Sequence, residues 1–234
     1  MRREFYFYLL SFLFFTWNAI SWNAISAQSL QRPSLNILSE GTIKYKDLEL
    51  GIILNTWTMP DEHFEESCRL AQELGVHWVK TIIRWDVAEP SKGNYYWDLA
   101  DYKIEQIMRL SGVKNIVVLI GNTPLWASGV SPDTPEYWTY PPINPQDFKD
   151  FVTAVVSRYK DRIKYWEIWN EPNLDEYWKG TDEQYVTLLH YGYEGVKSAD
   201  PNALVISGGM SNADFDWTRR MYEYGWKPYF DILG

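Results

Sequence analysis

Residues 165–173, with the sequence YWEIWNEPN, form a short apolar run that carries two carboxylates and is stopped by a proline. Aromatic and β-branched side chains dominate the run, and Pro172 cannot donate a hydrogen bond to a sheet, so the pattern predicts a strand. Side-chain alternation along a strand places four of these residues on one face: Tyr165, Glu167, Trp169 and Glu171. A carboxylate at the end of a buried strand is costly unless a partner or a reaction uses it.

Strand and helix patterns alternate along the rest of the chain. Strands are expected at 48–54, 77–85, 114–120, 163–169 and 203–207, and a sixth begins at 230–233. Helices are expected at 60–74, 98–110, 144–159, 181–198 and 216–224, where caps and apolar stripes mark their limits. This alternation predicts an α/β protein with a parallel sheet and helices outside it.

Two parallel architectures fit such an alternation. An open doubly wound sheet is the alternative to a (β/α)₈ barrel, but it calls for a Gly-x-Gly turn after the first strand. The sequence there is NTWT at residues 55–58, with no glycine. The barrel is therefore favoured, and active sites of such barrels lie at the carboxyl ends of the strands.

Two segments resemble those of a known enzyme group. The run at 165–173 resembles the Trp-Asn-Glu-Pro signature of the clan A glycoside hydrolases, and EIWNEPN looks most like family 39 and related endoglycosidases. The segment 85–97, WDVAEPSKGNYYW, is similar to the loop that often follows strand two in this clan. The resemblance covers residues 47–234. It implies an incomplete, N-terminal portion of a (β/α)₈ barrel with about six β/α units. For the run at 165–173 taken by itself, the alternative is a surface turn after an edge strand.

The resemblance also implies roles. Glu171 would be the general acid/base and Asn170 would bind the sugar 2-hydroxyl. In a retaining mechanism the two carboxyl groups stand about 5–5.5 Å apart. In the family the nucleophile is a second glutamate at the end of strand seven, which is expected beyond residue 234.

Other candidate site residues lie at neighbouring strand ends. Trp126 after strand three, and less directly Trp57 after strand one, are candidate sugar platforms, with packing at the barrel rim as the alternative. The family has a supporting arginine on strand two, where Lys80 is the nearest match and Arg84 lies four residues on. Glu167 is expected to be a buried carboxylate paired with Lys80 or Arg84, and the alternative is a second catalytic acid.

Composition narrows the range of partners. A net charge of −9 argues against nucleic acid and anionic membranes. The 13 Trp and 17 Tyr residues favour a carbohydrate ligand, since aromatic rings stack on sugar C–H faces. The three histidines lack metal-ligand spacing, so neither a metal nor another cofactor is expected.

The N-terminus has the pattern of an export signal. Arg2 and Arg3 precede an apolar run at 5–17, and small residues at 24–26 offer a cleavage site. We expect a signal peptide at 1–26, a linker at 27–44 and the partial catalytic domain at 45–234. The protein would then be secreted, periplasmic or on the cell surface, without stable membrane association after cleavage; the alternative is a signal anchor that stays in the membrane.

The sequence thus predicts a retaining glycoside hydrolase that acts on O-glycosidic bonds of a poly- or oligosaccharide. Two alternatives stay open, a non-catalytic carbohydrate-binding protein and an inactive truncated fragment.

Overall fold

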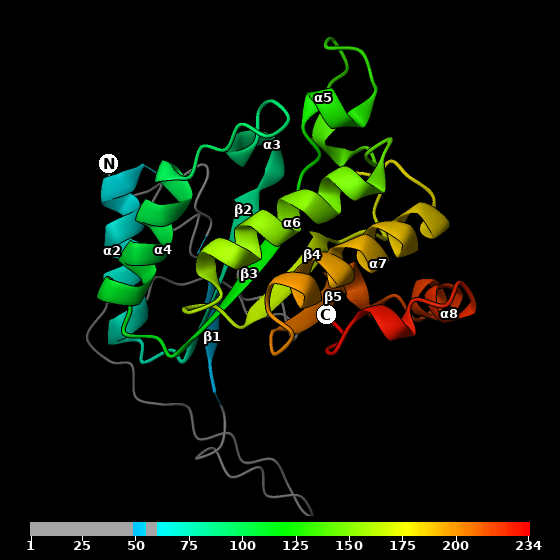
Figure 1. Ribbon diagram of the computed structural model, residues 1–234. Coiled ribbons are helices and arrows are strands. Elements are labelled where there is room, and N and C mark those ends of the chain that lie inside the picture. Colours follow the sequence, from blue (N-terminus) through cyan, green and yellow to red (C-terminus); the bar gives the residue numbers. More distant parts are fainter. Residues whose placement is uncertain (1–48, 55–59) are drawn as a thin grey trace, which may run out of the picture. The chain divides into compact units, whose positions relative to one another are not determined.

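Parallel strands follow one another along the sheet in the same order as along the chain. The computed structural model describes residues 49–54 and 60–234. The strands are β1 (Gly51–Ile53), β2 (Trp78–Arg84), β3 (Asn115–Gly121), β4 (Tyr165–Asn170) and β5 (Leu204–Gly209). They form a parallel sheet of order β1-β2-β3-β4-β5 (Figure 1).

A helix follows each strand, as the sequence predicts. The long helices are α2 (Asp61–Glu73), α4 (Asp98–Leu110), α6 (Pro145–Tyr159), α7 (Asp182–Ala199) and α8 (Phe215–Glu223). Shorter turns are α3 (Trp85–Ala88), α5 (Leu125–Ser128), η3 (Tyr137–Thr139), η4 (Ser211–Ala213) and η5 (Lys227–Tyr229). A capping box between Thr181 and Gln184 marks the start of α7.

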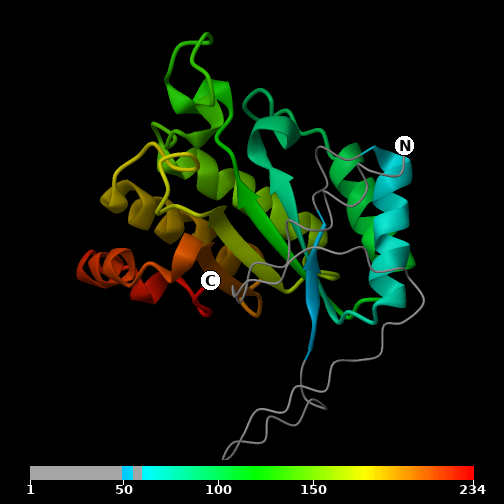
Figure 2. The ribbon, with the colours of Figure 1, turned by 180° about the vertical axis from the view of Figure 1, so that it is seen from behind.

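The helices pack on one face of the sheet. In β2, Val79, Thr81 and Ile83 are buried, whereas the residues that alternate with them are only partly buried. Figure 2 shows the strands from the face opposite α6 and α7. A doubly wound sheet carries helices on both faces and reverses its strand order, so this arrangement is that of a partial (β/α)₈ barrel.

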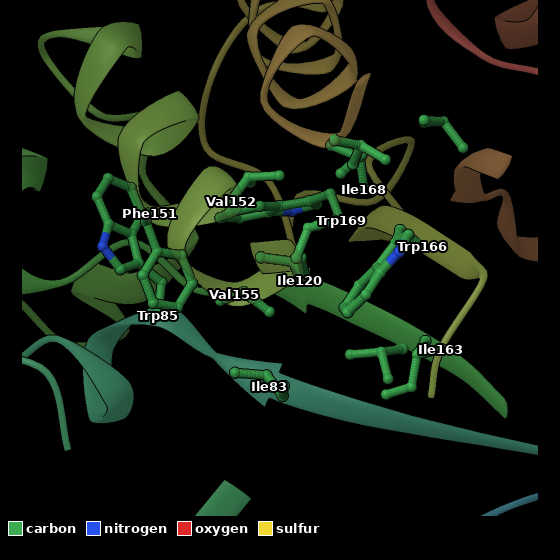
Figure 3. Close-up of a cluster of buried hydrophobic side chains, with 14 of the residues drawn as sticks. Ile83, Trp85, Ile120, Phe151, Val152, Val155, Ile163, Trp166, Ile168 and Trp169 are labelled. Carbon is green, nitrogen blue, oxygen red and sulfur yellow. The ribbon is translucent and has the colours of Figure 1, made fainter. Parts of the chain in front are cut away.

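One hydrophobic core joins sheet and helices. Side chains from β2, β3 and β4 meet those of α6 there, among them Ile83, Ile120, Val155 and Trp166 (Figure 3). All four are at most 1 % exposed. The core fixes the strands from outside and leaves their carboxyl ends to the loops.

The sixth predicted strand is present only as a bridge. Ile232 makes one isolated parallel bridge with Ile206 of β5. Its N–H donates to the carbonyl of Val205 at 3.0 Å, and its carbonyl accepts from the N–H of Ser207 at 3.0 Å. The chain therefore begins to pair along β5 in the direction that a sixth strand requires.

Candidate active site

The end of β4 brings the two motif residues to the carboxyl edge of the sheet. Asn170 pairs in register with Gly209 of β5. The next N–H, that of Glu171, donates to the carbonyl of Gly209 at 3.0 Å. Glu171 has φ of 43°, in the left-handed region where a non-glycine residue is uncommon and must be held by its surroundings.

Strand alternation ends before Glu171. Trp169 has φ of 72°, so the regular pleat that was expected to put Glu167, Trp169 and Glu171 on one face stops there. The Trp169 indole N–H donates to the carbonyl of Tyr177 at 2.9 Å, and its ring meets that of Trp178 edge-on at 5.0 Å. The direction of Glu171 is consequently set by its bond to β5 and not by strand parity.

The Glu171 side chain has no internal partner among the described residues. It is half-buried, and no hydrogen bond or ion pair from them reaches its carboxylate. The loop beyond it is fixed, because the Asn173 side-chain amide donates to the carbonyl of Ser211 at 3.1 Å and accepts from its N–H at 2.9 Å. A carboxylate on a fixed backbone, without an internal partner, is suited to act on an external ligand.

Glu167 has the opposite environment. It is 3 % exposed, and the Lys80 ammonium lies 2.7 Å from one carboxylate oxygen and 2.6 Å from the other. Gly209 N–H donates to the same carboxylate at 3.1 Å. The predicted pairing of Glu167 is thus found, and its partner is Lys80.

Arg84, the other candidate partner of Glu167, pairs with Asp86 instead. Its guanidinium donates twice to Asp86, at 2.9 and 2.6 Å, and lies 5.6 Å from the ring centroid of Trp138. Burial acts to lower the pKa of Arg84, but the bonds to Asp86 outweigh it and raise that pKa. Burial, together with the Asp86 charge, raises the pKa of Tyr137 as well. Arg84 therefore holds η3 against the end of β2, and within the described part of the chain no hydrogen bond or ion pair joins it to Glu167 or Glu171.

The loop after β2 is tied to the core. Glu89 is 3 % exposed and accepts from the indole N–H of Trp85 at 2.6 Å and from Gly93 N–H at 2.7 Å. Burial raises the pKa of Glu89 despite these two bonds. Gly93 has φ of 78°, which glycine adopts without a Cβ clash. The Glu89 carboxylate therefore shapes this loop.

The two tryptophan candidates differ in what the structure says of them. Trp126, in α5, is partly buried, and its indole N–H donates to the carbonyl of Glu89 at 2.8 Å. Its ring lies 5.6 Å from that of Trp85, edge-on, and the Lys92 ammonium is 5.9 Å from its centroid. These are the contacts of rim packing. Trp57 lies outside the described residues.

Two residues of the site were missed by sequence reasoning. Asp86 takes Arg84 as its partner, and its only signal was its position two residues beyond that arginine. Gly209 bonds to both Glu167 and Glu171, and no local sequence pattern predicts this because Gly209 lies on β5, about 40 residues away from both. Across residues 49–54 and 60–234 no group of three metal-ligating side chains occurs, and no helix is long and apolar enough to span a membrane.

The chain is similar to known glycoside hydrolases. A model of the glycosyl hydrolases family 39 matches residues 131–229, which include Asn170 and Glu171. A beta-xylosidase of Geobacillus stearothermophilus is 33 % identical over 92 residues, which are 35 % of this chain and 18 % of that protein. Endo-1,4-beta-xylanase B of Thermotoga neapolitana is 25 % identical over 164 residues, covering 65 % of this chain and 43 % of that protein.

Solved structures agree on the fold. The family 39 beta-xylosidase of Caulobacter crescentus superimposes with a TM-score of 0.62 at 22 % identity, over 79 % of this chain and 45 % of that one. A family 39 glycoside hydrolase of Bacteroides cellulosilyticus WH2 gives a TM-score of 0.61 at 21 % identity, over 78 % of this chain and 36 % of that one. The chain spans less than half the length of each of these relatives.

Proposed function

The chain is a family 39-like relative of the clan A glycoside hydrolases, and we propose that the protein hydrolyses O-glycosidic bonds of a poly- or oligosaccharide with retention of configuration. One observation carries the proposal: Glu171, half-buried at the end of β4, has a fixed backbone and no internal partner among the described residues. A proton donor to a leaving oxygen needs both properties.

The proposed chemistry divides between two carboxyl groups. Glu171 protonates the leaving oxygen and then, as a carboxylate, activates the water that releases the product. Asn170, beside it, binds the 2-hydroxyl of the sugar. Glu167 is not proposed as the nucleophile, because Lys80 and Gly209 already occupy its oxygens. The family resemblance assigns that role to a glutamate on a seventh strand, and the sheet described here contains five.

Xylose-containing polymers are the first substrates to test. The relatives above are named as beta-xylosidases and endo-1,4-beta-xylanases. We expect product release from a β-linked xylan or xylo-oligosaccharide in a panel of polysaccharides, with the first-formed sugar observed by proton NMR in the same anomeric form as the substrate. Inverted product would contradict the retaining mechanism, in which the second carboxylate is a nucleophile and not a general base. Binding to the panel without release of reducing ends would support the carbohydrate-binding alternative.

Trp126 is proposed as a sugar platform in addition to its packing role. We expect Trp126→Ala to weaken oligosaccharide binding about tenfold, which corresponds to about 1.4 kcal/mol. Trp126→Phe is the matched control, because it keeps an aromatic face and loses the donor to Glu89. Calorimetric titration together with melting temperature separates the two roles. Unchanged affinity in both variants, with reduced stability, would leave Trp126 with packing alone.

Export is a separate proposal that rests on the N-terminal sequence. Residues 1–26 have a basic start, an apolar run and small residues before Ala27. N-terminal sequencing of the mature protein is expected to start near Ala27, after which residues 27–44 link to the domain at 45–234. A membrane-bound product that keeps Met1 would refute this and favour the signal anchor.

A further inference from the structure

The geometry points to Glu167 as a positioning residue that holds the backbone of Glu171 through Gly209. The inference rests on the proposed function for its catalytic consequence, since Glu171 is the proposed acid/base. It goes beyond that function by assigning a task to a buried ion pair that touches no substrate. Three consecutive contacts lead from β2 to the end of β4.

The first contact anchors the Glu167 carboxylate. Glu167 is 3 % exposed, and the Lys80 ammonium reaches both of its oxygens, at 2.7 and 2.6 Å. Removing a carboxylate from water is costly unless a charge and hydrogen bonds compensate it. Lys80 supplies the charge from β2, so the carboxylate has a fixed place between two strands.

The second and third contacts use the two sides of one glycine. Gly209 N–H donates to Glu167 Oε1 at 3.1 Å. The carbonyl of the same Gly209 accepts from the N–H of Glu171 at 3.0 Å. Glu167 therefore holds the residue on β5 that in turn holds Glu171. Neither contact reaches the Glu171 side chain, which stays available for a substrate.

The backbone at Trp169 and Glu171 has a strained conformation that needs support from neighbouring residues. Glu171 has φ of 43° and Trp169 has φ of 72°, and a left-handed conformation at a non-glycine residue is strained and persists only where the surrounding structure holds it. Release of the Gly209 contact would let Glu171 move toward ordinary φ values. The Glu171 carboxylate would then move away from the position of the leaving oxygen. A displacement of a catalytic group by about 1 Å can lower the rate of the chemical step about 10²-fold.

The glycine pair on β5 fits this arrangement closely. A Cβ on Gly209 would lie 3.3 Å from Glu167 Oε1. A Cβ on Gly208 would lie 2.8 Å from the hydroxyl of Tyr185 and 3.0 Å from the carbonyl of Ile168. That hydroxyl accepts from Gly208 N–H at 2.7 Å and donates to Ile168 at 3.2 Å. A side chain at either position would disturb the end of β5, to which the Glu171 N–H is hydrogen-bonded.

The test first measures the backbone, independently of any hydrolysis. In the full chain, Glu167→Leu removes the acceptor for Gly209, whereas Glu167→Gln keeps an oxygen in its place. We expect Glu167→Leu to speed exchange of the Glu171 amide by about tenfold or more relative to that of Ile107, a buried residue of α4, and Glu167→Gln to change it much less. Equal acceleration at Ile107 and Glu171, or none at Glu171, would overturn the inference.

Lys80 gives a second pair of variants should Glu167→Leu not fold. Lys80→Met removes the charge that fixes Glu167 and is expected to speed exchange of the Glu171 amide selectively. Lys80→Arg keeps a cation and is expected to restore the slow exchange. Failure of Lys80→Met to affect Glu171, in a folded protein, would contradict the inference just as directly.

The catalytic consequence is measured in the active protein. Mispositioning of an acid is expected to lower kcat/KM about 10²-fold for aryl glycosides with poor leaving groups and far less for activated ones, with little change in KM. Equal losses for both classes would indicate a merely structural role for Glu167. If Glu167→Leu selectively speeds exchange of the Glu171 amide but the parent protein hydrolyses nothing, the proposed function is refuted. The link from Glu167 through Gly209 to Glu171 would still be supported.

Discussion

Glu171→Ala is expected to lower kcat/KM by about 10²- to 10⁴-fold on substrates whose leaving group must be protonated. The reason is that departure of an alkoxide without a proton donor is slow, whereas an activated phenolate leaves without help. A series of aryl glycosides of increasing leaving-group pKa is therefore expected to show a steeper decline in kcat/KM for the variant than for the parent. Steady-state kinetics on the active protein measures this slope.

Two observations complete that experiment. Azide is an anionic nucleophile that needs no general base, so in the second step it can attack the anomeric carbon of the glycosyl-enzyme in place of water. It is therefore expected to accelerate turnover of an activated substrate by Glu171→Ala and to form a glycosyl azide. Glu176→Ala is the matched control, because Glu176 is an exposed carboxylate on the same loop. Equal losses across the whole series without an azide response, or a similar loss in Glu176→Ala, would exclude the general acid/base role of Glu171.

Phe151→Ala is expected to lower the free energy of unfolding by about 3–5 kcal/mol. Phe151 is fully buried in α6, and its ring stacks on that of Trp85 at 5.6 Å (Figure 3). The same ring also stacks on Trp97 at 6.4 Å and on Tyr95 at 6.5 Å. Its removal leaves a cavity and also frees the loop at 85–97 from the helix. Urea unfolding, monitored by tryptophan fluorescence, measures the difference in free energy of unfolding between Phe151→Ala and the parent.

A second phenylalanine serves as the control for this change. Phe215 begins α8 and is 84 % exposed, so Phe215→Ala is expected to change the free energy of unfolding by no more than about 0.5 kcal/mol. A small effect at Phe151, or equal effects at both positions, would contradict the view that the aromatic contacts hold the loop after β2.

The sequence predicted the helices well because their signals are local. The helix expected at 98–110 has those bounds in α4, and Gly112 beyond it has φ of 63°. At α7 the Thr181 hydroxyl accepts from Gln184 N–H while the Gln184 side chain accepts from Thr181 N–H. Caps and apolar stripes involve residues within a few positions of one another, so one sequence is sufficient to recognise them.

The sequence could not predict how the strand ends meet. Period-two alternation assumes extended backbone up to Glu171, and the left-handed φ of Trp169 breaks that assumption. Strand register alone does not choose between Lys80 and Arg84 as the partner of Glu167, because Glu167 is opposite Leu119 and Leu119 is opposite Ile82, midway between the two cations. The competing partner of Arg84 is Asp86, just beyond the end of the same strand. Contacts such as that of Lys80 with Glu167 join residues distant in sequence, and hydrophobic pattern alone does not rank them.

The order of the strands has a consequence for synthesis on the ribosome. Because each strand pairs with the one translated just before it, every β/α unit can add to an edge that already exists when it emerges. The backbone N–H of Glu171 is the exception, since its acceptor, the carbonyl of Gly209, is translated roughly 40 residues and about 2–8 s later at 5–20 residues per second. During that interval β1 to β4 can pair while Glu171 still lacks its hydrogen bond to β5, so the proposed acid/base reaches its final position later than the strands before it.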